Sequence, residues 1–145
     1  MELRDLIVTP LVIFAVYAFA YVVRPWVTDS VNRKYFFPAL TVRIGCALAV
    51  GFLYQFYYNG GDTFAYHTHG SRPLWEAIME SPSDGFSLLF LNGEYGPGMW
   101  KTANRIWYWN DPQSFFVIRI AAILDIFTFS SYSATAVLFA VIAFT

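Results

Sequence analysis

The stretch that decides the fold is residues 6–23, LIVTPLVIFAVYAFAYVV. It carries no charged residue over 18 positions, and about this many apolar residues are needed for an α-helix to cross a bilayer. Pro10 lies near its start, where the first-turn amides of a helix are unpaired in any case. Arg24-Pro25 is expected to end the helix. The stretch therefore predicts a first membrane span.

The sequence before this run indicates a retained span rather than a cleaved signal peptide. Arg4 is the only basic residue before the run, and the acidic residues Glu2 and Asp5 flank it. No small-x-small cleavage site leads into a polar segment.

A second apolar run, residues 36–58, predicts a second span. Its one charge, Arg43, lies near its basic end, from where the side chain can reach the headgroups. Gly45 and Gly51 offer small surfaces for close contact with another helix. Its far end is aromatic, as expected of a membrane interface. The aromatic residues there are Tyr54, Phe56, Tyr57 and Tyr58.

The composition supports the same class. Hydrophobic residues make up 57% of the chain and charged residues 13%, with a mean hydropathy of +0.46; soluble domains carry about 25% charged residues. We therefore expect an all-α, polytopic membrane protein forming a single transmembrane domain. The net charge of −1 gives no indication of a nucleic-acid partner. Cys46 is the only cysteine, and we interpret it as a small packing residue.

The charges predict an orientation. Residues 24–35 hold three basic residues and one acidic residue, whereas residues 59–114 hold three basic and six acidic residues. The positive-inside rule then places the short turn in the cytoplasm and the long loop, with the N-terminus, on the outer side.

The long loop, residues 59–114, is expected to be structured. Residues 72–80 predict an amphipathic helix, which residues 82–85 interrupt, and residues 99–109 predict a second one. Such helices lie in the membrane interface. Between them, residues 86–91 are apolar but too short to span, and residues 92–98 have turn composition. The apolar positions of the two helices are Leu74, Trp75, Ile78 and Met79, and Trp100, Ala103, Ile106 and Trp107.

The last apolar stretch, residues 115–145, is longer than one straight span needs. Residues 130–133, SSYS, interrupt it. We expect a buried or interfacial helix at 115–129 and a third span at 132–145; two short spans with a re-entrant turn are the alternative. Because no polar flank follows the run at Thr145, we expect the native polypeptide to continue.

The candidate site is the sequence GGDTFAYHTH, residues 60–69. The paired glycines allow a sharp turn and the close approach of a ligand. Asp62 is placed to cap a short helix, on which Asp62, Tyr66 and His69 would share one face. A carboxylate at a partly dry interface can act as a general base, and two histidines can move protons or contact phosphate.

Simpler interpretations of this sequence stand beside the catalytic one. Asp62 can be a helix cap alone, and the histidines can be ordinary interfacial residues. The spacing of Asp62, His67 and His69 matches no recognised metal-binding motif, so no metal or other cofactor is expected.

Four further charges are candidates. Arg119 and Asp125 lie inside an apolar helix, where charges face the protein interior or a watery cavity and serve either function or a structural ion pair. Lys101 and Arg105, four residues apart, can hold a phosphate group at the membrane surface or simply solvate one helix face. No nucleotide-binding loop, nucleophile elbow, HExxH or CxxC motif is present in the sequence.

Residues 61–67, GDTFAYH, together with Phe116–Ile120 and Ser131-Tyr132, give residues 36–145 a resemblance to the amino-terminal part of polytopic GT-C-type glycosyltransferases. That resemblance implies a bacterial inner-membrane enzyme with a polyprenyl-phosphate-linked donor. Asp62 would be the base that activates the acceptor. His67, Lys101, Arg105 or Arg119 would contact the donor phosphate. Tyr66 and His69, which share the predicted face with Asp62, are further candidate substrate-binding residues.

Two other functions remain open from the sequence. The chain can be a non-catalytic accessory subunit of a larger membrane complex, in which case its partners are membrane lipid and other subunits. His67 and His69 can also bind haem or a metal.

Overall fold

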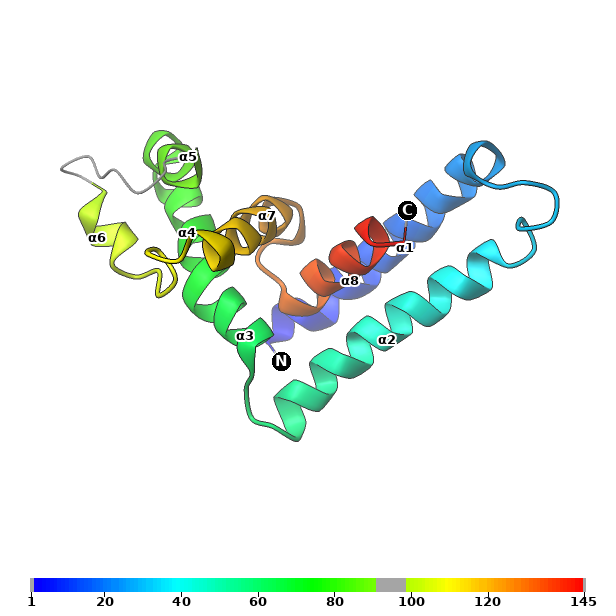
Figure 1. The fold of residues 1–145 in the computed structure, drawn as a ribbon, viewed down its shortest axis with the longest axis horizontal. Coiled ribbons are helices and arrows are strands. Elements are labelled where there is room, and N and C mark those ends of the chain that lie inside the picture. The colour runs from blue at the N-terminus through cyan, green and yellow to red at the C-terminus, as the bar shows by residue number, and fades with distance from the viewer. Residues whose placement is uncertain (1, 91–98, 145) are drawn as a thin grey trace. The chain divides into compact units, whose positions relative to one another are not determined.

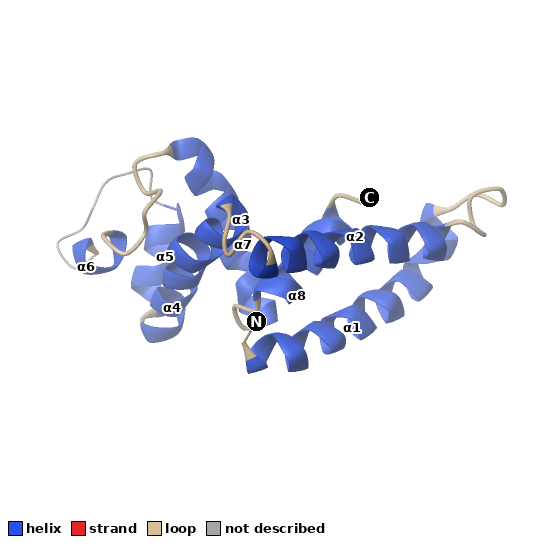
Figure 2. Cartoon of the chain, turned by 90° about the horizontal axis from the view of Figure 1, so that it is seen from below, coloured by secondary structure: helices blue, strands red, loops and turns tan. Residues whose placement is uncertain are grey.

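The computed structural model describes residues 2–90 and 99–144, and within these ranges every regular element is a helix (Figure 2). The all-helical prediction is confirmed for these residues. The turn predicted at residues 92–98 lies outside them. The helices are α1 (Leu3–Val27), α2 (Phe36–Phe56), α3 (Asp62–Tyr66), the π-helix η1 (His67–Ser71), α4 (Arg72–Glu80), α5 (Pro82–Phe90), α6 (Trp100–Ala103), α7 (Pro112–Thr128) and α8 (Tyr132–Ile142).

The chain divides into two compact units. The first, called the span unit here, contains the residues up to Asn59 and those from Ser131 onward; the second, the loop unit, contains Gly60–Ser130. The span unit therefore holds α1, α2 and α8, and the loop unit holds the helices between α2 and α8 (Figure 1).

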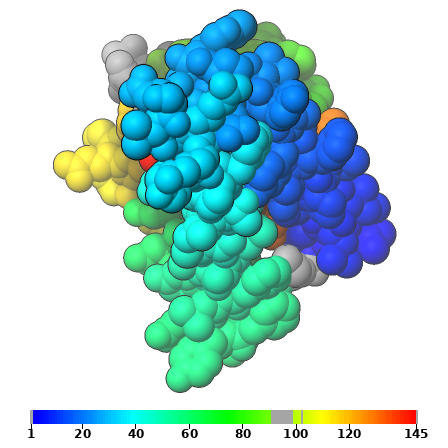
Figure 3. Space-filling model, turned by 90° about the vertical axis from the view of Figure 1, so that its right-hand side faces the viewer, coloured from blue at the N-terminus to red at the C-terminus, as the bar shows by residue number. Residues whose placement is uncertain are grey.

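Two helices, α1 and α2, are long and apolar enough to cross a membrane, which indicates a membrane protein. Figure 3 shows the face that they present, in blue and cyan. With 11 residues, α8 is shorter than a span needs. Together with α7, from which residues 129–131 separate it, α8 makes a candidate third span, broken or re-entrant.

Helix α1 is longer than the predicted span at both ends. The backbone N–H of Glu2 donates to Asp5 Oδ2 at 2.9 Å, and the helix begins at Leu3. It also runs past Arg24-Pro25 to Val27, so the expectation that this dipeptide stops it was wrong. Pro25 is tolerated because it lies in the last turn, where only one hydrogen bond of the helix is lost.

The prediction that Pro10 lies in the first turn of the helix was also wrong. Because α1 begins at Leu3, Pro10 is its eighth residue and lies beyond the first turn. The helix therefore lacks the hydrogen bond that an N–H at this position would donate to the carbonyl of Leu6.

Helix α8 packs against both α1 and α2 and completes the core of the span unit (Figure 1). A Cβ on Gly51 would meet the Tyr132 ring at 3.2 Å, so the predicted close helix contact exists at this glycine. Gly45 has no atom within 4 Å of such a Cβ among the described residues. The buried residues of this core are Val16, Ala20, Leu40, Ile44 and Val137.

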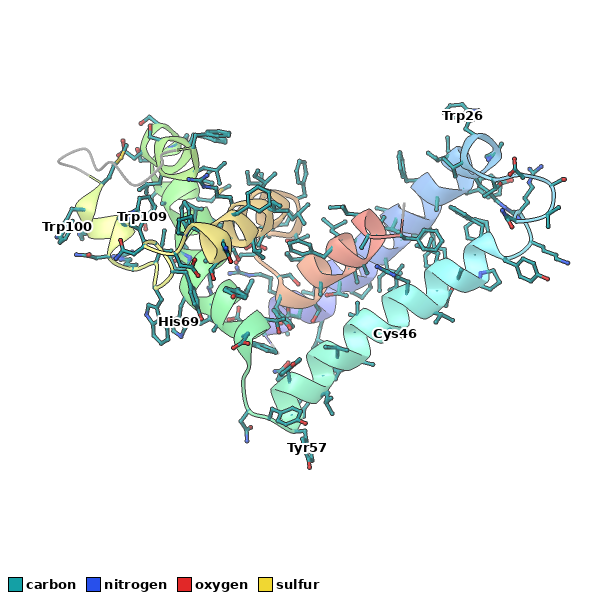
Figure 4. The ribbon with its side chains drawn as sticks, viewed as in Figure 1. Trp26, Cys46, Tyr57, His69, Trp100 and Trp109 are labelled. Atoms are coloured by element: carbon teal, nitrogen blue, oxygen red, sulfur yellow. The ribbon has the colours of Figure 1, made fainter. Side chains whose placement is uncertain are left out.

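Cys46 lies exposed on α2 (Figure 4), so the interpretation of this residue as packed within the chain was wrong. Arg43, on the same helix, is exposed as expected for a side chain that reaches toward the headgroups.

In the loop unit, α3, η1 and α4 follow one another without a break from Asp62 to Glu80. The predicted helix at residues 72–80 is confirmed as α4, with Leu74 and Ile78 buried, whereas Met79 is exposed. Residues 82–85 do not form the predicted interruption. Only Ser81 separates the two helices, because Pro82 takes the first position of α5, where a proline fits.

The second predicted amphipathic helix, at residues 99–109, is mostly absent. Only Trp100–Ala103 is helical. The residues that follow turn away because the N–H of Trp107 donates to the carbonyl of His69 at 3.1 Å instead of to its own helix. The β-branched and aromatic residues 106–109 also have low helix propensity. Ala103 and Ile106 are buried, whereas Trp100 and Trp107 are exposed, so the predicted common face does not form.

Helix α7 confirms the helix predicted at residues 115–129, with its first residue at Pro112. Its buried face completes the core of the loop unit. That core consists of Leu74, Ala77, Leu88, Leu89, Ala103, Ile106, Trp109, Phe115, Ile118 and Ala122. The helix ends at Thr128, and the next two residues, Phe129 and Ser130, both lie in the left-handed region with φ values of 52° and 55°. This pair of strained residues forms the predicted break before α8.

Candidate functional site

The structure places Asp62 at the first position of α3, one residue later than predicted. Gly61 is the N-cap residue, so the expected capping role of Asp62 was wrong. Gly60, with φ of 139°, provides the turn that leads into the helix, in a conformation that residues with a Cβ rarely adopt. Asp62 is exposed, and its carboxylate makes no hydrogen bond with any residue in the described ranges.

The π-helix η1 rotates the residues that follow α3. Asp62 and Tyr66 both lie in α3 and keep α-helical spacing, whereas His69 lies in η1. Because a π turn holds more residues than an α turn, His69 is shifted from the position that α-helical spacing predicts. The three side chains have different surroundings: Asp62 is exposed, Tyr66 packs on Tyr108, and His69 packs on Trp107.

Tyr66 is tied to the N-terminus of α7. Its hydroxyl lies 3.2 Å from Ser114 Oγ, and the Ser114 hydroxyl donates to Asp111 Oδ2 at 2.5 Å. Since the proton of Ser114 is directed at Asp111, the hydroxyl of Tyr66 is the donor to Ser114. The Tyr66 ring lies on Tyr108, with ring centroids 4.8 Å apart. Tyr66 therefore orders the loop unit around the candidate site.

Asp111 is the N-cap of α7 and accepts from the backbone N–H of Gln113 at 3.2 Å. The hydrogen bond from the Ser114 hydroxyl, followed by those from the backbone N–H groups of Gln113 and Ser114, holds the pKa of Asp111 below its ordinary value of 3.8. Asp111 is therefore a structural carboxylate that stays ionised and holds the start of α7.

The two histidines have different environments. His67 is buried, and its Nε2 lies 3.5 Å from the hydroxyl of Ser130 in the strained break after α7. His69 lies at the surface of the loop unit (Figure 4), where its ring is parallel to the indole of Trp107. Within residues 2–90 and 99–144, no group of three or more His, Cys, Asp or Glu side chains is placed to hold a metal ion.

The four charged candidates differ in their burial. Asp125 is fully buried, as expected for a charge in an apolar helix, and Arg119 is partly buried with its guanidinium 4.6 Å from the centre of the Phe115 ring. Lys101 is exposed on α6, and Arg105 is exposed beyond the end of that helix. The expectation that these two share a helix was therefore wrong.

One buried polar cluster in the span unit was not anticipated. The Oδ1 atom of Asp5 accepts a hydrogen bond from Ser131 Oγ at 2.7 Å, and both residues are buried. Thr9 and Thr135, each one turn further along its helix, are buried as well. The sequence carried a signal for this cluster, since Asp5 and Thr9 on α1 and Ser131 and Thr135 at the start of α8 share the i, i+4 spacing of one helix face.

Comparison with known proteins adds no relative: no family model, no curated protein and no solved structure matches the chain. The fold and the two long apolar helices thus define the class, an all-helical membrane protein.

Proposed function

We propose that the chain is part of a bacterial inner-membrane transferase that moves a sugar or a related group from a polyprenyl-phosphate-linked donor to an acceptor. The observation that carries this proposal is the state of Asp62. Its carboxylate is exposed, caps no helix and hydrogen-bonds to no described residue. It begins α3 four residues after Tyr58, the last residue of the aromatic run 56–58 at the end of α2.

In the proposed reaction, Asp62 is the general base. Its carboxylate takes the proton of an acceptor hydroxyl as that oxygen forms a bond to the anomeric carbon of the donor. The bond between the anomeric carbon and the phosphate oxygen breaks, and the polyprenyl phosphate leaves with the electron pair. A base placed in this way accelerates a reaction about 10²–10⁴-fold.

Cationic side chains of the loop unit support the donor half of the proposal. Lys101 and Arg105 are exposed and can bind a phosphate group through charge-assisted hydrogen bonds. Arg119 is partly buried beside Phe115, and His67 is enclosed in the loop unit; for these two the proposed contact with the donor requires the site to open.

The membrane placement follows from charge and length. Helices α1 and α2 cross the bilayer, and α7 with α8 forms a third, broken span. The basic turn between α1 and α2 lies in the cytoplasm and Asp62 on the outer side. Helix α4, whose buried and exposed faces differ in polarity, lies at the membrane interface.

The test is transfer from a radiolabelled polyprenyl-phosphate sugar by the native polypeptide in proteoliposomes. The Asp62→Asn variant keeps the size of the side chain and removes the base, so turnover should fall by about 10²–10⁴-fold. Asp29→Asn, an exposed aspartate of the basic turn, is the matched control and should transfer normally. Turnover of Asp62→Asn equal to that of the control, at equal thermal stability, would remove the proposal.

A second candidate function is that of an accessory subunit, and two exposed positions of α2, Arg43 and Gly45, favour it. Arg43 is exposed within this apolar helix and pairs with none of the residues that the structure describes, while nothing in these ranges approaches Gly45. A neighbouring subunit would supply an acidic group and a close helix contact. Cross-linking through the exposed Cys46 to one protein at fixed stoichiometry would support this function, and an active monodisperse chain would contradict it.

A further inference from the structure

A stacked pair of aromatic rings stands at the surface of the loop unit. The rings of His69 and Trp107 lie 3.7 Å apart between centroids, with only 1° between their planes. The N–H of Trp107 also donates to the carbonyl of His69 at 3.1 Å. The ring contact and the backbone hydrogen bond together hold the indole in one orientation.

One face of this indole is open. Trp107 is 67% exposed although the ring of His69 covers one of its faces. So large an exposed fraction requires the opposite face to be accessible. An exposed indole that another ring already orients loses little conformational entropy when a ligand covers it, so it is preorganised for binding.

The surroundings of Trp107 indicate what covers the open face. The exposed neighbours along the chain are polar: Asn104 and Arg105 before it, and Asn110 and Asp111 after it. A bilayer would leave these groups without hydrogen-bond partners. A sugar ring instead presents C–H groups to an aromatic face and hydroxyl groups to amide, guanidinium and carboxylate groups at its edge.

We infer that Trp107, backed by His69, is a binding platform for a pyranose ring. The inference rests on the proposed function in one respect, the assignment of that ring to a sugar of the transfer reaction. The ring is part of either the acceptor or the lipid-linked donor, and the two share the chemistry that the platform recognises.

Direct binding tests the platform without any need for turnover. The protein is placed in phosphatidylcholine nanodiscs, because alkyl glycoside detergents would themselves occupy the site. Methyl β-D-glucopyranoside and methyl α-D-mannopyranoside are titrated, with tryptophan fluorescence and saturation-transfer NMR as readouts. Glycerol, which has hydroxyl groups but no ring, is the control ligand.

Trp107→Ala should weaken glycoside binding about tenfold or more, the effect of losing one aromatic contact. Trp107→Phe should lie between wild type and Trp107→Ala, and His69→Ala should weaken binding less than Trp107→Ala. Trp100→Ala removes another exposed tryptophan of the same unit and should bind as wild type. Equal affinity of Trp107→Ala and wild type, or no saturable binding of either glycoside to wild type, would overturn the inference.

A bilayer is the competing occupant of the indole face. Nanodiscs with brominated lipids distinguish the two, because bromine quenches tryptophans that lie among the acyl chains. The difference in quenching between wild type and Trp107→Phe should be small, and strong quenching assigned to Trp107 would overturn the inference.

The kinetics of the transfer assay identify which substrate carries the sugar. They also test the platform independently of the proposed function. In the transfer assay, Trp107→Ala should raise the KM of only one substrate, which identifies the acceptor or the donor as the ligand. If Asp62→Asn is fully active and Trp107→Ala binds glycosides more weakly, the proposed role of Asp62 is contradicted and the platform is not. If Asp62→Asn loses activity while Trp107→Ala keeps its KM values and its glycoside binding, the platform is contradicted and the proposed role of Asp62 is not.

Discussion

The carboxylate of Asp5 and the hydroxyl of Ser131 are joined by a 2.7 Å hydrogen bond across 126 positions of the chain. The bond links the first turn of α1 to the residue before α8. Ser131 is also the N-cap of α8, since its Oγ accepts from the N–H of Ala134 at 3.4 Å. One serine therefore both starts α8 and attaches it to α1.

Asp5→Ala should destabilise the span unit by about 1–3 kcal/mol, because a buried hydroxyl loses its acceptor. Asp5 is only 7% exposed, so water cannot fully replace it. Thermal unfolding in detergent measures the loss, with Asp29→Ala in the exposed turn as the control. A double-mutant cycle with Ser131→Ala should show that the two effects are not additive. Additive losses would mean that the two residues act separately.

Gly51→Leu should destabilise the contact between α2 and α8 by roughly 1–3 kcal/mol, because a larger side chain has no room beside the ring of Tyr132. Gly45→Leu on the same helix is the matched control and should be neutral within the chain, since no described atom approaches it. Unfolding midpoints of the two variants in lipid nanodiscs provide the comparison. Equal midpoints would contradict the packing of α8 against Gly51.

Gly85→Ala should destabilise the loop unit by roughly 1–3 kcal/mol through overpacking. An added methyl group at this position would fall on the backbone of Ile78, which cannot move without shifting α4. A glycine in an open helix would instead gain stability when replaced by alanine. Ser87→Ala, on the same helix, is the control. Hydrogen exchange of α4 and α5 measures the effect, and unchanged protection in Gly85→Ala would contradict the close crossing.

Acid should weaken the start of α7 through Asp111. The pKa of Asp111 is lower in the folded protein than its ordinary value of 3.8, chiefly because the Ser114 hydroxyl donates to the carboxylate. The contribution of Asp111 to stability is therefore fully present above about pH 3.8 and is lost as the pH falls through the pKa of the folded protein. Carboxyl NMR titration should give a pKa below 3.8 for wild type and a higher one for Ser114→Ala. An identical pKa in both proteins would contradict this role of Ser114.

The sequence predicted the elements whose formation depends on local pattern. The uncharged run at residues 6–23 and the run at residues 36–58 became α1 and α2, because a segment in a bilayer must satisfy its backbone hydrogen bonds within itself. The helix at residues 72–80 was predicted from its amphipathic spacing, and the break before α8 from the polar residues 130–133. Their residue types carry the conformational preference themselves.

Contacts between distant residues decided the rest. Residues 104–109 leave the helical path because Trp107 bonds to His69, and no pattern within the segment reports a carbonyl 38 positions away. His69 was shifted relative to Asp62 and Tyr66 by a π-helix, whose larger number of residues per turn cannot be read from α-helical spacing. The sequence alone thus determined the membrane class and the two long helices. Only the tertiary structure decided which polar side chains meet, because a hydrogen bond or a ring contact depends on where the whole chain brings each partner.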